Sequence, residues 1–279
     1  MVNNFQLPPM GFGPGSQPPE EDGQDLDYMQ MPQDMRTYSA HIPEMGQDQD
    51  LAPALDLLSA IAAAADRCGR GGAGSVFDLA PLDAANRRLI AETMGEGEVS
   101  VKMHGKPAVA AQESVFAGVW CLKGAGIDSI EVGPVPAAAR TAAFVARKPA
   151  IGTLAPRPAG VVNAPALLVE LIDKSAHFAP GAEAHVVNLT LLPHTEADLE
   201  WLDAALGAGS VSILSRGYGN CRIEATAQAH VWRVQFFNSM DVLILDTFEV
   251  TAMPEVALAA PEDLADSGAR ILEVLEAIR

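Results

Sequence analysis

Cysteine is scarce in this chain of 279 residues, with only Cys68, Cys121 and Cys221. Their number is odd and they stand far apart, without a C-x-x-C spacing, so the sequence indicates neither a disulfide framework nor a zinc site. None of the six histidines stands at a metal-ligand spacing from another histidine, a cysteine or a carboxylate within one expected element. We therefore expect no bound metal and no cofactor.

Long apolar runs are missing as well. No stretch approaches the roughly 20 apolar residues that a membrane-spanning helix needs. The first residues, Met1–Phe5, lack the basic and apolar regions of a secretory signal. Aromatic residues make up 5% of the chain, so the core should consist mostly of leucine, valine, isoleucine and alanine. These features predict a cytoplasmic protein without a stable membrane insertion.

Positive charge is also in short supply. The chain has 18 lysine and arginine residues against 36 aspartate and glutamate residues, which gives a net charge of −18. Such a chain repels phosphate backbones and anionic membrane surfaces, so we expect no nucleic-acid partner. Much of the negative charge lies in the first fifty residues, where Arg36 alone opposes nine acidic residues: Glu20, Glu21, Asp22, Asp25, Asp27, Asp34, Glu44, Asp48 and Asp50.

No catalytic constellation stands out in the sequence. The few serine and carboxylate motifs have no neighbouring base or nucleophile. The glycine pairs do not have the strand-to-helix context of a phosphate-binding loop. The sequence therefore predicts a protein that is not an enzyme.

What the sequence does contain is one unit that occurs twice, 112 positions apart. Ala52–Leu55 returns as Ala164–Leu167, and Trp120 corresponds to Trp232. After Trp120 the second copy gains six residues. We expect the two copies to share a fold, and we expect their differences to mark added function. Three pairs of glycines also match at this spacing: Gly95 with Gly207, Gly97 with Gly209, and Gly105 with Gly217.

Each unit is expected to form two helices followed by an antiparallel meander of three to four strands. Apolar residues at spacings of three and four predict the helices. Asp83 and Thr195 should cap the second helix of each unit, and Asn163 the first helix of the second unit. Alternation of small or apolar with polar residues over 221–227 predicts a strand. Helices followed by strands predict an α+β fold, closed by a C-terminal helix.

The expected organisation has four parts. Residues 1–49 show no sustained period and are interpreted as a flexible acidic tail. Residues 50–136 form the first α+β unit, and residues 162–279 form the second unit with the C-terminal helix. The connection between them, residues 137–161, is either a solvated linker or a partner for the acidic tail, because it carries Arg140, Arg147, Lys148 and Arg157.

Three segments are candidates for partner binding. The string 215–222 combines glycines with basic residues, although a tight hairpin turn would also explain it. The aromatic hairpin of the second unit either presents an apolar patch or packs into the core. The tail either is an inert linker or orders on a partner. These segments supply the candidate binding residues Arg216, Tyr218, Asn220, Arg222, Phe236, Phe237, Asn238, Met240, Met10 and Phe12.

Several contiguous strings carry a family resemblance. Pro8–Gln17 resembles the N-terminal signature of the HupH/HyaF/HoxQ family of hydrogenase expression/formation proteins. Ile213–Arg222, Gln235–Asp241 and Glu249–Glu255 resemble its C-terminal signature. The first copy lacks the Arg-Gly-Tyr-Gly-Asn-Cys string, so the resemblance assigns no binding role there.

The resemblance implies an accessory protein that matures a membrane-associated uptake [NiFe] hydrogenase. It implies a dedicated chaperone of the iron–sulfur small-subunit precursor, which carries a twin-arginine export signal, working beside a thioredoxin-like accessory protein. An acidic tail that contains methionine could attract such a signal. Two alternatives stay open: a metal or iron–sulfur carrier that uses the three cysteines, and a protein that binds a small ligand at the turn 217–220.

Overall fold

The computed structural model describes residues 50–217 and 220–278. The flexible tail predicted for residues 1–49 lies outside these residues. The elements follow in the order α1 (Ala52–Gly69), β1 (Ser75–Asp78), α2 (Ala84–Met94), β2 (Val99–Met103), β3 (Val109–Glu113), β4 (Val119–Gly124), β5 (Ile127–Val132), α3 (Ala137–Ala142), η1 (Gly152–Leu154), α4 (Ala164–Ala176), β6 (His185–Asn188), η2 (Leu189–Leu191), α5 (Glu196–Leu206), β7 (Val211–Ser215), β8 (Asn220–Ala225), β9 (Val231–Phe237), β10 (Leu243–Val250), η3 (Glu255–Ala257) and α6 (Pro261–Ile278).

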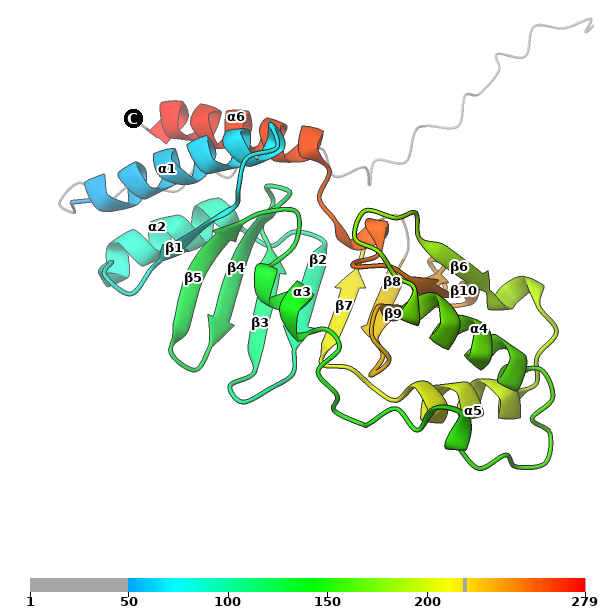
Figure 1. The fold of residues 1–279 in the computed structure, drawn as a ribbon. Helices are drawn as coiled ribbons and strands as arrows, with labels where there is room; N and C mark the ends of the chain where they lie inside the picture. Colours follow the sequence, from blue (N-terminus) through cyan, green and yellow to red (C-terminus); the bar gives the residue numbers. More distant parts are fainter. Residues whose placement is uncertain (1–49, 218–219, 279) are drawn as a thin grey trace, which may run out of the picture. The chain divides into compact units, whose positions relative to one another are not determined.

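The described strands form one antiparallel sheet of ten strands in the order β1-β5-β4-β3-β2-β7-β8-β9-β10-β6. The predicted mixture of helices and antiparallel strands is therefore confirmed, as is the C-terminal helix. Strand β2 of the first half pairs with β7 of the second half, and this pair joins the two halves. Figure 1 shows this sheet running from β5 on one side to β10 on the other.

The predicted meanders did not include the two strands at the edges of the sheet. Each half contains a four-stranded meander, and each adds a fifth strand, β1 or β6, between its two helices. These strands pair with the last strand of their own meander, β5 and β10 respectively. Both strands are four residues long, which is too short for a period-2 pattern to stand out in the sequence.

Three clusters of buried apolar residues hold the helices and loops on the sheet. The first lies under α1, α2 and α6 and includes Leu58, Ile130 and Ile271. The second includes Trp120 and Trp232 and draws on strands of both halves, under α3. The third lies under α4 and α5. The two tryptophans that correspond in the sequence therefore have the same role, since both are almost fully buried in this core.

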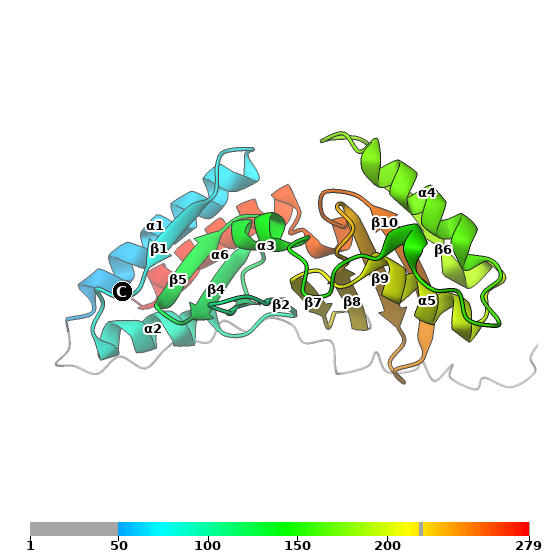
Figure 2. The ribbon, with the colours of Figure 1, turned by 60° about the horizontal axis from the view of Figure 1, so that its bottom comes forward.

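The two faces of the sheet differ in their cover. Helices α2 and α5 lie against one face, here called the α2/α5 face, near its two ends (Figure 2). Helix α3 and the loop around η3 cover the middle of the opposite face, here called the α3 face. Because α2 and α5 leave the middle of their face uncovered, side chains of β2 and β8 such as Lys102, Arg222 and Glu224 are exposed there.

The helix caps follow the sequence in two cases and depart from it in one. Asp83 and Thr195 accept hydrogen bonds from the N3 amides of α2 and α5, as predicted. The predicted cap by Asn163 is wrong, because its side chain makes no cap hydrogen bond and donates to the carbonyl of Pro193 instead. The carboxylate of Asp198 takes its place, accepting hydrogen bonds from the backbone N–H groups of residues 162, 163 and 164.

Candidate functional site

Most of the candidate residues of the second half gather at one end of its meander. The start of β8 and the β9–β10 hairpin lie side by side there, because Asn220 opposes Phe237 across the β8–β9 ladder. The side-chain amide of Asn220 also donates to the carboxylate of Asp241 at 2.7 Å, which ties the start of β8 to the hairpin. Tyr218, Met10 and Phe12 lie outside the described residues. We call this end of the meander the hairpin site.

The two phenylalanines of the hairpin point to opposite faces of the sheet. Phe236 packs against the central core on the α3 face. Phe237 lies on the α2/α5 face, where the guanidinium carbon of Arg222 is 5.4 Å from the centre of its ring. Both rings are half-buried. The two phenylalanines therefore pack against the sheet below the hairpin tip, and they are not the most exposed apolar groups of the site.

The hairpin tip presents a run of exposed apolar side chains. The side-chain oxygen of Asn238 accepts hydrogen bonds from the amides of Met240 and Val242, at 2.9 and 3.0 Å, and so holds the turn. Met240 is 80% exposed and Ile244 is 55% exposed. Val242 and Leu243 are exposed as well. A contiguous exposed apolar patch on an ordered turn is typical of a surface that binds another polypeptide.

Arg216 lies at the other loop of the hairpin site. Its backbone amide donates to the carbonyl of Glu98, which precedes β2. Its side chain is exposed. This residue therefore lies next to the join between the two halves, at the same end of the sheet as the hairpin tip.

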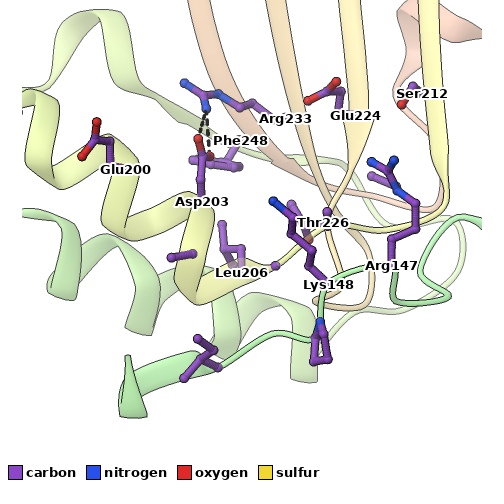
Figure 3. A pocket seen from close by; sticks show the side chains of 16 residues that line it. Arg147, Lys148, Glu200, Asp203, Leu206, Ser212, Glu224, Thr226, Arg233 and Phe248 are labelled. Carbon is purple, nitrogen blue, oxygen red and sulfur yellow. Dashed lines mark hydrogen bonds and ion pairs between the residues drawn. The ribbon is translucent and has the colours of Figure 1, made fainter. Parts of the chain in front are cut away.

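A cavity of about 1040 Å³ opens on the α2/α5 face between α5 and the sheet (Figure 3). Arg147 and Lys148 of the connection line one side, and Asp203 of α5 lines the other. The floor is formed by β7, β8, β9 and β10 through residues that include Ser212, Glu224, Arg233 and Phe248.

Arg233 is the best-anchored charge in this cavity. Its guanidinium donates two hydrogen bonds to Asp203 at 2.8 Å. It donates two more to Asp246, at 3.1 and 2.7 Å. Burial opposes the charge of Arg233, but the hydrogen bonds to Asp246 and the charge of Asp203 outweigh burial and raise its pKa. Arg233 therefore fixes α5 to the sheet and is already neutralised, so its role is structural.

The other charges that line the cavity are available to a ligand or partner. Arg147 donates to the carbonyl of Gly209 at 2.9 Å, and a backbone bridge between Lys148 and Ala208 holds the connection against the end of α5. Both side chains are exposed, and so is Glu224. The connection therefore does more than span the two halves, since its basic residues form one wall of a charged cavity.

The cysteines do not form a site within the described part of the chain. Cys68 and Cys221 are buried and Cys121 is half-buried, and all three are free thiols. Burial raises the pKa of Cys121 and of Cys221 to about 11. Metal binding requires the thiolate, so these two positions are unfavourable for a carrier. No group of three histidine, cysteine or acidic residues able to hold a metal ion occurs among the described residues.

Asp203, Glu224 and Arg233 were missed by the sequence analysis. A signal for two of them exists in the comparison of the copies: the positions 112 residues before Asp203 and Arg233 hold Ala91 and Cys121. An ion pair that appears in only one copy is a difference of the kind that should have been followed. Glu224 also differs from its counterpart Gln112, but only in charge, and this was a weaker signal of the same kind.

The chain was compared with families and proteins already known. The sequence model described as "HupH hydrogenase expression protein, C-terminal conserved region" matches residues 51–144 and 161–278. The chain belongs to this family. The HupH family match covers both halves of the sheet and breaks within the connection, near the basic wall of the cavity.

Full-length relatives agree with the HupH family match. The hydrogenase expression/formation protein HupH of Rhodobacter capsulatus is 65% identical over 279 residues, which is 100% of both chains. The hydrogenase expression/formation protein HoxQ of Cupriavidus necator is 46% identical, over 99% of this chain and 98% of its own. The hydrogenase-1 operon protein HyaF of Escherichia coli is 37% identical, over 71% and 72%.

One solved structure from the HupH family is similar to part of the chain. It is a hydrogenase expression protein HupH from Thiobacillus denitrificans, 32% identical, and the match covers 40% of this chain and 92% of that chain with a TM-score of 0.38. Within the described residues, no helix combines the length and the hydrophobicity needed to cross a membrane.

Proposed function

We propose that this protein is a non-enzymatic accessory protein for the maturation of a [NiFe] uptake hydrogenase. In this proposal it acts in the cytoplasm as a chaperone of the iron–sulfur small-subunit precursor before twin-arginine export, beside a thioredoxin-like accessory protein. Membership of the HupH family supports the pathway. The observation that carries the binding role is the apolar hairpin tip, with Met240 80% exposed on a hydrogen-bonded turn.

The surroundings of the tip suit a client that carries both apolar and charged groups. The α2/α5 face continues from Phe237 and Arg222 at the hairpin site to Glu224 and Arg233 at the cavity, since Glu224 opposes Arg233 across the β8–β9 ladder. A segment that packs its apolar side chains on the tip would therefore meet charges of both signs along the same face. Charged groups placed around an apolar anchor add specificity and speed of association.

We also infer that the scaffold is a duplicated unit whose copies pair about a local two-fold axis. Val101 and Ile213 stand 112 positions apart and are directly opposite each other in the β2–β7 ladder. Lys102 is opposite Ser212, and Ser100 is opposite Leu214. A pairing in which each strand meets its own counterpart is the geometry of an isologous interface.

Co-purification tests the binding role. The tagged chain is produced with the small-subunit precursor, and captured precursor is quantified for the wild type and for the variants Met240→Ser with Ile244→Ser, Phe237→Ala and Arg216→Ala. We expect the double serine variant to capture at least about tenfold less precursor, because it removes two exposed apolar contacts of a central patch. Leu154→Ser with Val162→Ser is the matched control, since both residues are more exposed than Ile244 but Leu154 lies on the connection and Val162 directly follows it. Equal capture by the hairpin variants and the control would place the binding surface elsewhere.

The cavity favours a second candidate function, the binding of a small ligand. Its volume of about 1040 Å³ is at the upper end for small-molecule sites. A thermal-shift screen with small anions, nucleotides and amino acids tests this candidate, since a ligand at a hundred times its dissociation constant adds about 2.7 kcal/mol of stability. A shift that disappears in Lys148→Ala would support this candidate over the chaperone function.

A further inference from the structure

The two edges of the sheet are protected to different degrees. At the β1 edge, the side chain of Arg67 donates to the hydroxyl of Ser75 at 2.9 Å, which places a cation at the first residue of the strand. At the β6 edge, residues 181–192 contain no lysine, arginine or proline. Natural proteins use such residues to block the pairing of a free edge with another chain. At the β6 edge the first residue, His185, contacts the carboxylate of Glu170 at 2.8 Å, so this edge lacks a neighbouring lysine, arginine or proline but carries an acidic group.

Strand β6 pairs on one side only. Its four residues oppose residues 247–250 of β10. None of the other backbone hydrogen bonds or isolated bridges recorded for the described residues involves residues 185–188. Half of the backbone N–H and C=O groups of an edge strand point away from its partner, so this edge offers donors and acceptors to an additional strand.

A hollow of about 610 Å³ adjoins this edge on the α3 face. Val186 of β6 is opposite Glu249 of β10, so both side chains lie on this face. Val186 is 50% exposed, and the apolar lining also includes Met253, Val256 and Leu258. Phe236 lines the hollow too, so the hollow is continuous with the hairpin site.

The polar part of the hollow is acidic. Glu249 and Glu255 line it, and no lysine, arginine or histidine is among the residues of its lining. Burial raises the pKa of Glu249, the hydrogen bond from Thr247 opposes this rise, and the charge of Glu255 adds to it. Neither carboxylate takes part in a recorded ion pair. A cation supplied from outside would relieve this repulsion, and an apolar group would fill the remainder of the hollow.

We propose that the free edge of β6 binds an extended segment of a protein partner as an added strand, and that the hollow receives an apolar and a basic side chain of that segment. Side chains on one face of a strand are two positions apart. The segment therefore carries a leucine-like residue two positions from an arginine or lysine. This inference rests on the proposed function in that the hydrogenase precursor is the natural source of the segment.

A short synthetic peptide tests the added strand without the precursor. The probe is acetylated, amidated and built from serine and threonine, with one arginine two positions from one leucine. It is titrated into the full-length ¹⁵N-labelled chain. We expect amide signals of residues 184–188 and 249–258 to shift. Two further probes carry N-methyl groups on every second backbone amide, one on the odd positions and one on the even positions. We expect one of them to lose binding and the other to keep it, because only every second amide of an added strand faces the edge of β6.

The charge requirement is tested with variants of both molecules. Glu249→Gln with Glu255→Gln should weaken binding of the probe about tenfold, and a probe with glutamate in place of arginine should not bind. Val186→Lys should also weaken binding. Val76→Lys on β1 is the matched control, because Val76 is an exposed valine at the second position of the other edge strand. Thermal unfolding of each variant confirms that it folds.

Each outcome separates this inference from the proposed function. Precursor capture that depends on the hairpin tip but is unchanged in Val186→Lys and in the double glutamine variant overturns the β6 inference and leaves the chaperone proposal intact. Peptide binding at β6 without precursor capture overturns the chaperone proposal only. Dimerisation of the wild type in sedimentation experiments that is lost in Val186→Lys would assign the edge to a second copy and overturn the inference.

Discussion

The carboxylate of Asp198 should contribute strongly to the stability of the second half. Its side chain is fully buried. One oxygen accepts hydrogen bonds from the amides of Val162, Asn163 and Ala164 at 2.7, 3.0 and 3.0 Å, and the other accepts from the amide of Thr195 at 3.0 Å. Asp198 therefore joins the beginnings of α4 and α5, the two helices that cover the third core.

The pKa of Asp198 indicates how much the charged form contributes. Burial alone would raise it, but the donors of Thr195, Ala164 and Val162 outweigh burial and lower it from 3.8 to about 2. Because the folded-state pKa is lower than the unfolded-state pKa, the contribution is fully present above about pH 4 and is lost as the pH falls towards 2. A difference of nearly two pKa units corresponds to about 2 kcal/mol.

The substitution Asp198→Asn tests this contribution while keeping the size of the side chain. The amide oxygen can still accept from residues 162–164, but the NH₂ group then faces the donor of Thr195. We expect the free energy of unfolding at pH 7, measured by urea denaturation, to fall by about 2 to 3 kcal/mol. The difference from the wild type should shrink to roughly half at pH 3, because the unfolded wild type is then mostly protonated at Asp198 while the folded wild type is still charged.

A control on the neighbouring helix α4 makes the result specific. Asp173 of α4 has a side chain that is 60% exposed, and Asp173→Asn should change the stability by less than about 0.5 kcal/mol. The reasoning fails if Asp198→Asn is as stable as the wild type at pH 7. It fails equally if the loss in Asp198→Asn is the same at pH 7 and at pH 3, because the carboxylate charge would then not be its cause.

Two further predictions follow from buried charges. Arg233→Ala leaves the carboxylate of Asp246, whose side chain is 6% exposed, without its ion pair, and should lower the free energy of unfolding in urea by about 3 kcal/mol. The control Arg70→Ala breaks an exposed ion pair and should lower it by less than about 1 kcal/mol. Equal losses in the two variants would contradict the structural role of Arg233. Burial raises the pKa of Glu113 from 4.5 to about 7, partly opposed by the amide of Gly118, so the folded state is penalised as the pH rises above 4.5. Glu113→Gln should therefore raise the free energy of unfolding at pH 8 by roughly 2 to 3 kcal/mol and change it little at pH 4.5; an equal effect at both values would show that charge is not the reason.

The sequence was sufficient for features that depend on local pattern. The caps Asp83 and Thr195 act within three residues of their own position. Gly95 and Gly207, which end α2 and α5, adopt φ angles of 56° and 66°, a region that favours glycine. These assignments need only a helix and its ends, and neither requires knowledge of what lies beside the helix.

Features that depend on distant partners were not accessible in the same way. The hydrogen bonds that Asp198 accepts from residues 162–164 span 34 to 36 positions, so its sequence context indicated only a residue in the first turn of a helix. The pairing of β2 with β7 spans more than a hundred positions and closes the sheet across the two halves. The cavity needs the connection, α5 and four strands together, which no single segment reveals.

In the candidate site, too, some residues could be found from the sequence and others could not. The hairpin insertion and the string before β8 were found because they differ between the copies, and the structure brings Arg216, Asn220, Phe237 and Met240 to one end of the meander. The apolar residues that follow, Val242, Leu243 and Ile244, were not among the candidate binding residues. Val242 precedes β10, and Leu243 and Ile244 are its first two residues. The register shifts between Leu243 and Leu245, and a bulge of this kind removes the alternation that places apolar residues inside.

The proposed duplication makes the differences between the two halves informative. Asn86 stands 112 positions before Asp198 and likewise holds the start of the first helix of its half, accepting from the amide of Ala54 at 2.9 Å. In the first half, α6 packs on α1. Its close backbone approach needs Gly69 and Gly268, where a Cβ atom would come within 2.6 and 2.8 Å of a backbone oxygen.

The equivalent helix α4 has no such partner among the described elements. Ala62 of α1 lies against Gly268 of α6, whereas the equivalent residue of α4 is Lys174. The polar residue His177, the C-cap of α4, is the equivalent of the buried Ala65. In the first half, α6 thus covers the surface of α1 that would otherwise be exposed, and it completes the core of that half. The apolar tip, the charged cavity and the unblocked edge all lie in the second half. Under the proposed duplication, a first half whose apolar surface is covered by α6 and a second half with exposed surfaces are expected when the first half supports the fold and the second half binds a partner.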